Sequence, residues 1–136
     1  MTSSVALTEP QRFTVAGLLR HFSRRRPDGE MLVQGRERRS WAQEFAVACR
    51  VAQAAKRDGL GAGDRIAFLD RNGIAYFDFL FGGSLIGAVN VAVNWRLAPP
   101  EMAAIIDDSG APLLVVHADY LHALADTEGG LPAVRR

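Results

Sequence analysis

Three short apolar runs, separated by helix-like segments, constrain the fold of this chain more than any other feature. The runs cover residues 66–69, 89–93 and 113–116. Each run is continuous rather than alternating, which is typical of strands buried on both faces. Strands that alternate with helical segments predict parallel pairing through right-handed crossovers. The sequence therefore predicts an α/β fold: a partial, doubly wound, mainly parallel sheet with helices on both faces.

The segments between and after these runs are predicted to be helices. Residues 74–86 are apolar on nearly every side, and residues 100–107 follow Pro99, which is a favourable residue at a helix start. A last short helix is expected over residues 120–126. Gly82 and Gly83 lie in the helix predicted over residues 74–86, and Gly87 follows it. We expect these glycines to allow this helix to approach the sheet closely.

Before the first run, the chain is predicted to form two helices joined by a small N-terminal hairpin. Apolar spacing over residues 13–22 predicts the first helix, with Thr14 as its N-cap. The hairpin is expected over residues 31–40, with a glycine at its bend. Residues 1–12 lack periodicity and are expected to be a flexible N-terminus ahead of one domain, residues 13–136.

The second of these helices is predicted to begin at a capping box. Ser40 and Gln43 have the spacing at which each side chain satisfies a free amide of the first turn. The helix is expected to end near Gly59. Cys49 falls on its apolar face and is expected to be a small buried hydrophobe.

Composition excludes several classes of function. The 136 residues are 49% hydrophobic and 23% charged, with a formal net charge of +1. That balance gives no electrostatic reason to expect a nucleic-acid partner or a membrane surface. No apolar run is long enough for a transmembrane segment, and no signal-peptide layout is present. With Cys49 as the only cysteine, no internal disulfide is possible, which fits a cytoplasmic protein.

Two patterns that suggest ligands have simpler explanations. Gly59, Gly61 and Gly63 follow a helix and precede a strand, whereas a phosphate loop needs the reverse order. We interpret them as a helix stop and a turn. His117 and His122 are five residues apart and diverge around a helix, so no metal site is predicted.

Asn94 and Arg96 are the candidate substrate-binding residues. They follow directly after the second predicted strand, and ligands of open α/β sheets bind at the carboxyl ends of strands. The alternative is structural, because polar side chains in loops often hydrogen-bond the turn itself.

Taken in order, several motifs resemble the N-terminal part of an AMP-dependent synthetase/ligase, the adenylate-forming family of acyl-CoA synthetases and fatty-acid–CoA ligases. The resemblance runs from about Phe13 to the end of the chain and is most specific at residues 93–97. Its other motifs are Ser40-Trp41-Ala42, Gly63-Asp64-Arg65, Asn72 and Asp108-Ser109-Gly110-Ala111. Two residues depart from the family pattern: Ala92 replaces the usual Pro, and Ala98 replaces a Thr or Ser helix cap.

The resemblance implies a ligase that activates a carboxylic or fatty acid. The family uses ATP and Mg²⁺ to form an acyl-adenylate and usually transfers the acyl group to CoA. Its phosphate loop, its adenine and ribose motifs and its lid domain with the catalytic Lys do not occur in this sequence. We therefore assign no catalytic residue and expect this fragment to bind none of these cofactors and to be inactive alone.

The resemblance favours a truncated N-terminal part of a bacterial acyl-CoA synthetase. The alternatives are a free-standing flavodoxin-like binding module and the structural half of a split ligase. As a fragment, it is expected to associate with the remainder of a ligase chain, or with itself through exposed apolar surface.

Overall fold

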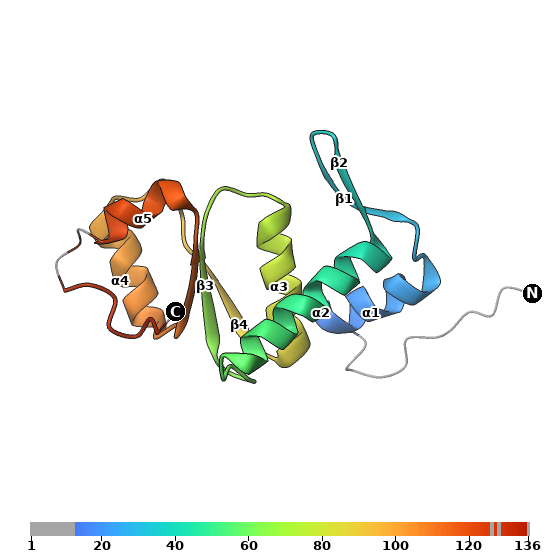
Figure 1. Cartoon of the computed structure of the whole chain (residues 1–136), viewed down its shortest axis with the longest axis horizontal. Helices are drawn as coiled ribbons and strands as arrows, with labels where there is room; N and C mark the ends of the chain where they lie inside the picture. The colour runs from blue at the N-terminus through green and yellow to red at the C-terminus, as the bar shows by residue number, and fades with distance from the viewer. Residues whose placement is uncertain (1–12, 126, 128, 136) are drawn as a thin grey trace, which may run out of the picture.

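The three apolar runs form the three strands of one parallel sheet (Figure 1). The computed structural model describes residues 13–125, 127 and 129–135. The strands are β3 (Arg65–Leu69), β4 (Val89–Ala92) and β5 (Leu113–Val116), in the order β4-β3-β5. Ala67 at the centre of β3 lies in register with Val91 on one side and Leu114 on the other. The parallel pairing predicted from the sequence is therefore confirmed.

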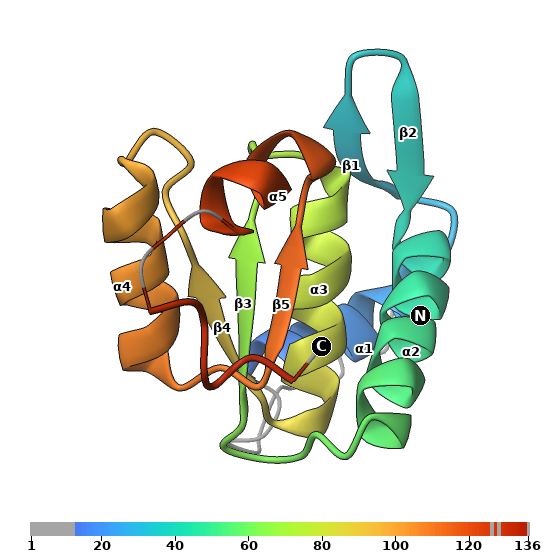
Figure 2. The same cartoon turned by 60° about the vertical axis from the view of Figure 1, so that its left-hand side comes forward.

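Helices cover both faces of this sheet, as Figures 1 and 2 show. On one face lies α3 (Ile74–Ile86), which joins β3 to β4. On the other face lie α4 (Pro99–Ser109) and α5 (Ala118–Ala125). The core under α4 and α5 includes Ala67, Leu69 and Ile106. The predicted α/β fold class, with helices on both faces, is confirmed.

The first two helices form an additional layer outside α3. α2 (Trp41–Arg57) packs along α3, and α1 (Val15–Arg25) packs against both helices. The close approach predicted for Gly82 is made to α2 rather than to the sheet, because a Cβ at Gly82 would lie 2.5 Å from Val51 Cγ1. Gly83 does face the sheet, at ordinary contact distance from Ile66.

Local signals in the N-terminal half are confirmed. The hydroxyl of Thr14 accepts a hydrogen bond from the Gly17 amide (3.0 Å) at the start of α1. At the start of α2, Ser40 and Gln43 form the complete capping box. Gly59, with φ of +83°, follows the end of α2, so the glycine turn is a helix stop, as predicted.

The predicted hairpin is also present and projects beyond the N-terminal end of α2 (Figure 2). It consists of β1 (Glu30–Gln34) and β2 (Glu37–Ser40), paired antiparallel. It lies at the same end of the molecule as the carboxyl edge of the three-stranded sheet.

Two burial predictions are wrong. Only β3 is buried along its length, whereas β4 and β5 are half-exposed and Val89 is 51% exposed. The reason is topological: in the described structure β3 is the only central strand, so each neighbour has an open edge. Cys49 is half-buried rather than buried, because it lines a shallow groove between α2 and the end of α3.

Boundaries shift by one to three residues at the other elements, the largest shift being at the end of the first helix, which continues to Arg25. The second strand ends at Ala92, and α4 begins at Pro99 and continues to Ser109. The last helix begins at Ala118 rather than Tyr120. Residues 1–12 and Asp126, which the predictions included, lie outside the described residues. Among the described residues, no helix combines the length and apolarity needed to cross a membrane.

Candidate functional site

The carboxyl edge of the sheet is the place where the described chain brings polar side chains together. Because all three strands are parallel, the segments that follow Leu69, Ala92 and Val116 leave the sheet at one edge. After β3 the chain turns to α3 on one face, and after β5 it turns to α5 on the other (Figure 1). This divergence makes the space between β3 and β5 a topological switch point, where α/β proteins bind ligands.

A shallow pocket of about 290 Å³ lies at this switch point. Its lining comes from residues 70–75 after β3, from His117 and Asp119 after β5, and from Gln34 at the end of β1. The His117 amide donates to the Leu69 carbonyl (3.0 Å), which joins the two strand ends. The hairpin therefore supplies one wall of a pocket whose other walls belong to the sheet.

Gln34 occupies the helix terminus that opens into this pocket. Gly73, the N-cap of α3, has no side chain to satisfy the first free amides of the helix. Gln34 Oε1 instead accepts a hydrogen bond from the Ile74 amide (3.0 Å), across 40 residues of chain. The first amide of α3, at the positive end of the helix dipole, is thus already hydrogen-bonded to a side chain of the protein.

An aromatic and arginine cluster lies beside the pocket. The Arg96 guanidinium lies 4.2 Å from the centre of the Trp95 ring, and that of Arg71 lies 5.2 Å from it. Arg71 Nε also donates to the Tyr120 hydroxyl (3.4 Å), and this bond raises the pKa of Arg71. Cation–π contact with Trp95 positions both guanidinium groups, and the N–H groups of Arg96 are directed to no carboxylate among the described residues.

The two sequence-predicted candidates lie at this edge but outside the pocket lining. Asn94 Oδ1 accepts from the Arg96 amide (3.0 Å), and the Leu97 amide donates to the Asn94 carbonyl (3.2 Å). Asn94 therefore shapes the turn, as the structural alternative predicted. Arg96 is exposed and oriented on Trp95, so its charged group is available.

Sequence reasoning missed Arg71 and Tyr120. The rule that selected Asn94 and Arg96, position directly after a buried strand, applies equally to Arg71 after β3. Tyr120 carried no such signal, because only the fold of α5 brings its hydroxyl to Arg71.

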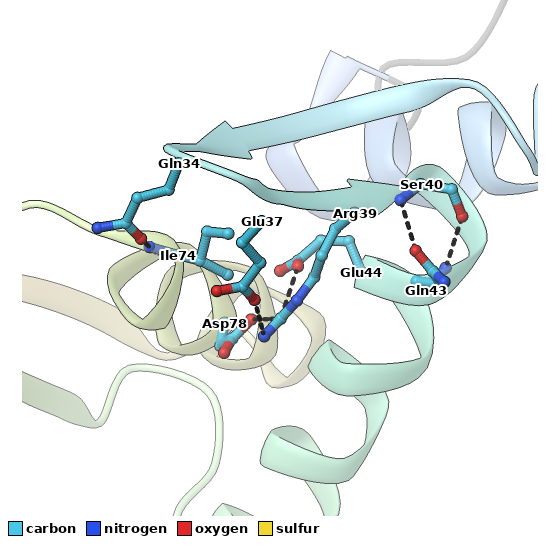
Figure 3. A network of polar contacts seen from close by, with 8 residues as sticks. All are labelled: Gln34, Glu37, Arg39, Ser40, Gln43, Glu44, Ile74 and Asp78. Atoms are coloured by element: carbon cyan, nitrogen blue, oxygen red, sulfur yellow. Dashed lines mark hydrogen bonds and ion pairs between the residues drawn. The ribbon is translucent and has the colours of Figure 1, made fainter.

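A second polar group, shown in Figure 3, joins the hairpin to the helices. Arg39 of β2 extends between α2 and α3, where its Nη1 contacts Asp78 of α3 and Glu44 Oε2 of α2 (3.3 Å). Its Nη2 contacts Glu37 (3.4 Å). Glu44 is fully buried, and sequence analysis missed it because a charged residue in an amphipathic helix is normally placed on the solvent face.

The described residues do not fit Mg²⁺ or the phosphates of ATP. No three His, Cys, Asp or Glu side chains are grouped within residues 13–125, 127 and 129–135 in a way that could hold a metal ion. The glycine turn at residues 59–63 leads into a strand, and the exposed terminus of α3 is capped by Gln34. Phosphate binding uses free amides at a helix start: the glycine turn does not begin a helix, and at α3 the Ile74 amide is already bonded to Gln34.

Comparison with protein families gives a match to the family described as AMP-binding enzyme over residues 19–136. The chain belongs to the AMP-binding enzyme family. This result agrees with the resemblance found in the sequence, and the adenylate-forming ligases with which the chain aligns are acyl-CoA and fatty acid ligases.

Curated relatives of this chain are much longer than it is. The long-chain-fatty-acid–CoA ligase FadD13 of Mycobacterium tuberculosis is 36% identical over 98 residues, which cover 68% of this chain and 20% of FadD13. The 3-hydroxybenzoate–CoA ligase of Aromatoleum is 34% identical, covering 76% of this chain and 20% of the ligase. The fatty acid–[acyl-carrier-protein] ligase ScoC of Streptomyces coeruleorubidus is 44% identical over 71 residues, 52% of this chain and 14% of ScoC. The chain thus spans about a fifth of these relatives, or less.

Solved structures of the same family share the fold. The N-terminal domain of FACL13 from Mycobacterium tuberculosis superposes with a TM-score of 0.83 at 28% identity, covering 89% of this chain and 32% of that domain. The anthranilate CoA ligase AuaEII gives a TM-score of 0.85 at 25% identity, covering 91% of this chain and 24% of AuaEII. The fold therefore corresponds to a part of the N-terminal domain of acyl-CoA ligases.

Proposed function

We propose that this chain forms part of an ATP-dependent acyl-CoA synthetase. In this proposal the whole enzyme uses ATP and Mg²⁺ to convert a carboxylic or fatty acid to an acyl-adenylate, and then forms a thioester with CoA. The observation that carries the proposal is the match to FadD13 over 68% of this chain, a relative whose name states both the fatty acid and CoA. The proposal also retains the cytoplasmic location predicted from the single cysteine.

The contribution of this chain is structural support for the site rather than bond-making chemistry. Its described residues do not fit the metal or the nucleotide phosphates, as argued above from the donor groups themselves. What it offers is a rigid carboxyl edge, on which the segments after β3, β4 and β5 are fixed by hydrogen bonds. The proposed role is to form one wall of the acyl and adenylate site.

Arg96 is the proposed substrate contact on this edge, and Asn94 is its positioning residue. Among the described residues, Arg96 has no carboxylate partner, and its guanidinium lies over the Trp95 ring, 4.2 Å from the ring centre. A guanidinium in that state suits an anionic group of a substrate. Asn94 acts through the turn, because its side chain accepts the amide hydrogen of Arg96 itself.

The first test uses the chain by itself. Purified protein is mixed with ATP, Mg²⁺ and fatty acids of several chain lengths, and release of pyrophosphate is followed. The expected result is no release above the rate without protein. Sustained turnover would show that the chain holds reactive groups of its own and would contradict the structural role.

The second test reads the DNA that follows this reading frame. An in-frame or frameshifted continuation that encodes a phosphate loop rich in Ser, Thr and Gly supports the ligase proposal. Its absence supports the free-standing module, which should then bind a nucleotide or acyl ligand without further sequence.

The third test addresses Arg96 in the intact ligase that contains this chain. Replacing Arg96 with Ala is expected to raise the KM of the anionic substrate about tenfold or more, as loss of one charge-assisted hydrogen bond implies. Arg96→Lys should recover only part of the affinity, because Lys lacks the planar fork. Arg36→Ala, in the exposed hairpin turn, is the matched control, and an equal effect there would contradict the assignment.

The proposed partner of this chain is the remainder of a ligase domain. When the chain is alone, we expect it to associate with other copies of itself instead. Support comes from the half-exposed strands β4 and β5, which present apolar side chains such as Val89 at open edges. Open strand edges of this kind pair with other chains unless they are covered.

A further inference from the structure

Glu44 on α2 lies in surroundings where ionisation of its carboxyl group costs free energy. Its side chain is fully buried, and among the described residues its Oε1 atom has no hydrogen-bond partner. Its other oxygen, Oε2, lies 3.3 Å from Arg39 Nη1. A buried carboxylate is tolerated when its oxygens are paired and hydrogen-bonded, and here only one of them is.

Arg39 cannot neutralise Glu44 on its own, because it also serves two other carboxylates. The same Nη1 contacts Asp78, and Nη2 contacts Glu37. With every carboxyl group ionised, one positive charge faces three negative charges. Burial is the largest cause that raises the pKa of Glu44, the Asp78 carboxylate also raises it, and Arg39 lowers it, so that the pKa is about 7.

The charged surroundings of Glu44 come from the elements that pack against α2. α3 contributes Asp78, and β2 contributes Arg39 and, through it, Glu37. On β1, Glu30 is paired with Arg38 (3.1 Å) instead. On α1, Arg20 lies beside the groove lined by Phe45 and Cys49, on another side of α2, and the His21 ring contacts Phe22.

The hairpin is the covering that can be removed from Glu44 at least cost. Its strands are mostly exposed, and its side-chain hydrogen bonds to α3 are two: Gln34 to the Ile74 amide, and Arg39 to Asp78. Figure 3 shows that Arg39 reaches Glu44 from the hairpin. Lifting the hairpin would therefore withdraw Arg39 and open a path for water to Glu44. Regions with few buried apolar contacts open first.

We propose that Glu44 is a proton-dependent switch for the β1–β2 hairpin. With the proton on Glu44, the carboxyl group is neutral, Arg39 pairs with Asp78, and the hairpin stays on α3. When the proton passes to solvent, the buried carboxylate is satisfied best by water, and the hairpin is released. Gln34 leaves the Ile74 amide in the same movement, so the switch also removes one wall of the pocket at the carboxyl edge.

Amide hydrogen exchange on the complete chain tests this proposal. Exchange is measured at about pH 6 and about pH 8.5 and corrected for intrinsic rates. Protection of the β1–β2 amides and of the Ile74 amide is expected to fall about tenfold or more at the higher pH. Amides of α4, which lies on the far side of the sheet, are the internal reference: those that exchange by local opening should not change, and those that exchange through global unfolding should change only as much as the free energy of unfolding measured with urea. Unchanged protection of the hairpin would overturn the proposal.

Two variants separate the switch from a general effect of pH. Glu44→Gln keeps the shape and removes the charge, so hairpin protection should no longer depend on pH. Glu37→Gln makes the same change on the exposed member of the cluster and should leave the dependence in place. If the Glu44→Gln protein retains the full pH dependence, Glu44 is not the switch.

A direct titration keeps the proposal testable when a variant does not fold. The side-chain carboxyl carbon of Glu44 in the unmodified protein is followed by NMR as a function of pH. A midpoint near 7 that coincides with the loss of hairpin protection supports the proposal. A midpoint near the ordinary glutamate value of 4.5 would overturn it.

Discussion

Single residues decide how tightly the outer helical layer of this chain can close. Gly82 is the clearest case, since a Cβ there would meet Val51 Cγ1 at 2.5 Å and the Ala48 carbonyl at 3.1 Å. Glu44 lies on α2, the helix that carries Val51 and Ala48, and it places a buried carboxyl group near Asp78 of α3, where an apolar side chain is expected. Gly82 permits the close approach of α2 and α3, and Glu44 makes the stability of that contact depend on protonation.

Gly82→Ala is expected to destabilise the protein by about 1–3 kcal/mol, because α2 and α3 must move apart to admit the methyl group. Gly83→Ala is the matched control on the same helix: its Cβ would meet Ile66 Cδ1 at an ordinary 3.4 Å. Both variants gain the same helix propensity, so the difference between their denaturation midpoints isolates the steric effect. Equal midpoints would mean that α2 and α3 adjust freely.

Stability should depend on pH through Glu44. Its pKa is higher in the folded protein (about 7) than in the unfolded chain (4.5), so the folded state holds a proton that the unfolded state has lost. The free energy of unfolding therefore falls as pH rises from about 4.5 to about 7, by at most about 3 kcal/mol. Urea denaturation across this range measures the slope, and an increase in stability with pH would contradict the assignment.

Asp78→Asn should shorten the pH range over which the free energy of unfolding falls, but it should not remove the pH dependence. The change removes the carboxylate that raises the pKa of Glu44 and leaves Arg39 paired with Glu44 and Glu37. Burial, the larger cause, remains. The same urea series on this variant should show stability levelling off at a lower pH than in the unmodified protein.

At the scale of elements, the positions of most helices and strands could be predicted from the sequence, but the extent to which neighbouring elements bury each strand could not. Continuous apolar composition located α3 and β5 to the residue, because each is bounded by clear turn residues. The same composition wrongly predicted that Val89 is buried, since apolar continuity cannot say how many neighbours a strand has. Burial at an edge is decided by topology.

The carboxyl-edge site was predictable in part. Position after a buried strand identified Arg96, and the same rule extends to Arg71. Gln34 and Tyr120 were beyond reach, because each meets its partner across 40 or more residues: Gln34 at Ile74, and Tyr120 at Arg71. Contacts of that sequence separation carry no local signal.

Arg65 shows how one strand residue can complete a helix. Its Nε donates to the Ser109 carbonyl (2.6 Å) and its Nη2 to the Gly110 carbonyl (3.1 Å), at the end of α4. These carbonyl groups have no partner within the helix. The guanidinium also complements the negative end of the α4 dipole.

Arg65→Ala is therefore expected to lower the free energy of unfolding by about 1.5–3 kcal/mol, the range for hydrogen bonds made by a charged group. Arg65→Lys should restore part of the loss, because one ammonium cannot reproduce the fork. Arg36→Ala, in the exposed hairpin turn, should change stability by less than about 0.5 kcal/mol. Thermal denaturation of the three variants measures these differences.

At the scale of the whole molecule, the described sheet has one central strand and two open edges. Val89 on β4 is 51% exposed, and Leu121 on α5 is equally exposed at 51%. Apolar side chains beside unpaired strand edges favour association between chains. The AMP-binding relatives, of which this chain covers a fifth or less, have further sequence with which such edges can be covered.

Val89→Lys should reduce self-association of the isolated chain, because a charge at a strand edge opposes pairing. Val33→Lys is the matched control: Val33 is 52% exposed, but it lies on the hairpin and not on the sheet. Light scattering over a range of concentrations is expected to show a lower mass for Val89→Lys alone. A monodisperse monomer without any substitution would contradict the proposal of open, associating edges.

The strand order β4-β3-β5 also has a consequence for synthesis on the ribosome. The middle strand is made first, and neither of its neighbours exists until later segments have been translated. At about 5–20 residues per second, roughly 2–10 s separate the completion of β3 from that of β5. Throughout that interval the nascent chain carries the strand that is most buried in the finished sheet without a partner on at least one side, so residues 65–69 are a target for a chaperone that captures hydrophobic segments.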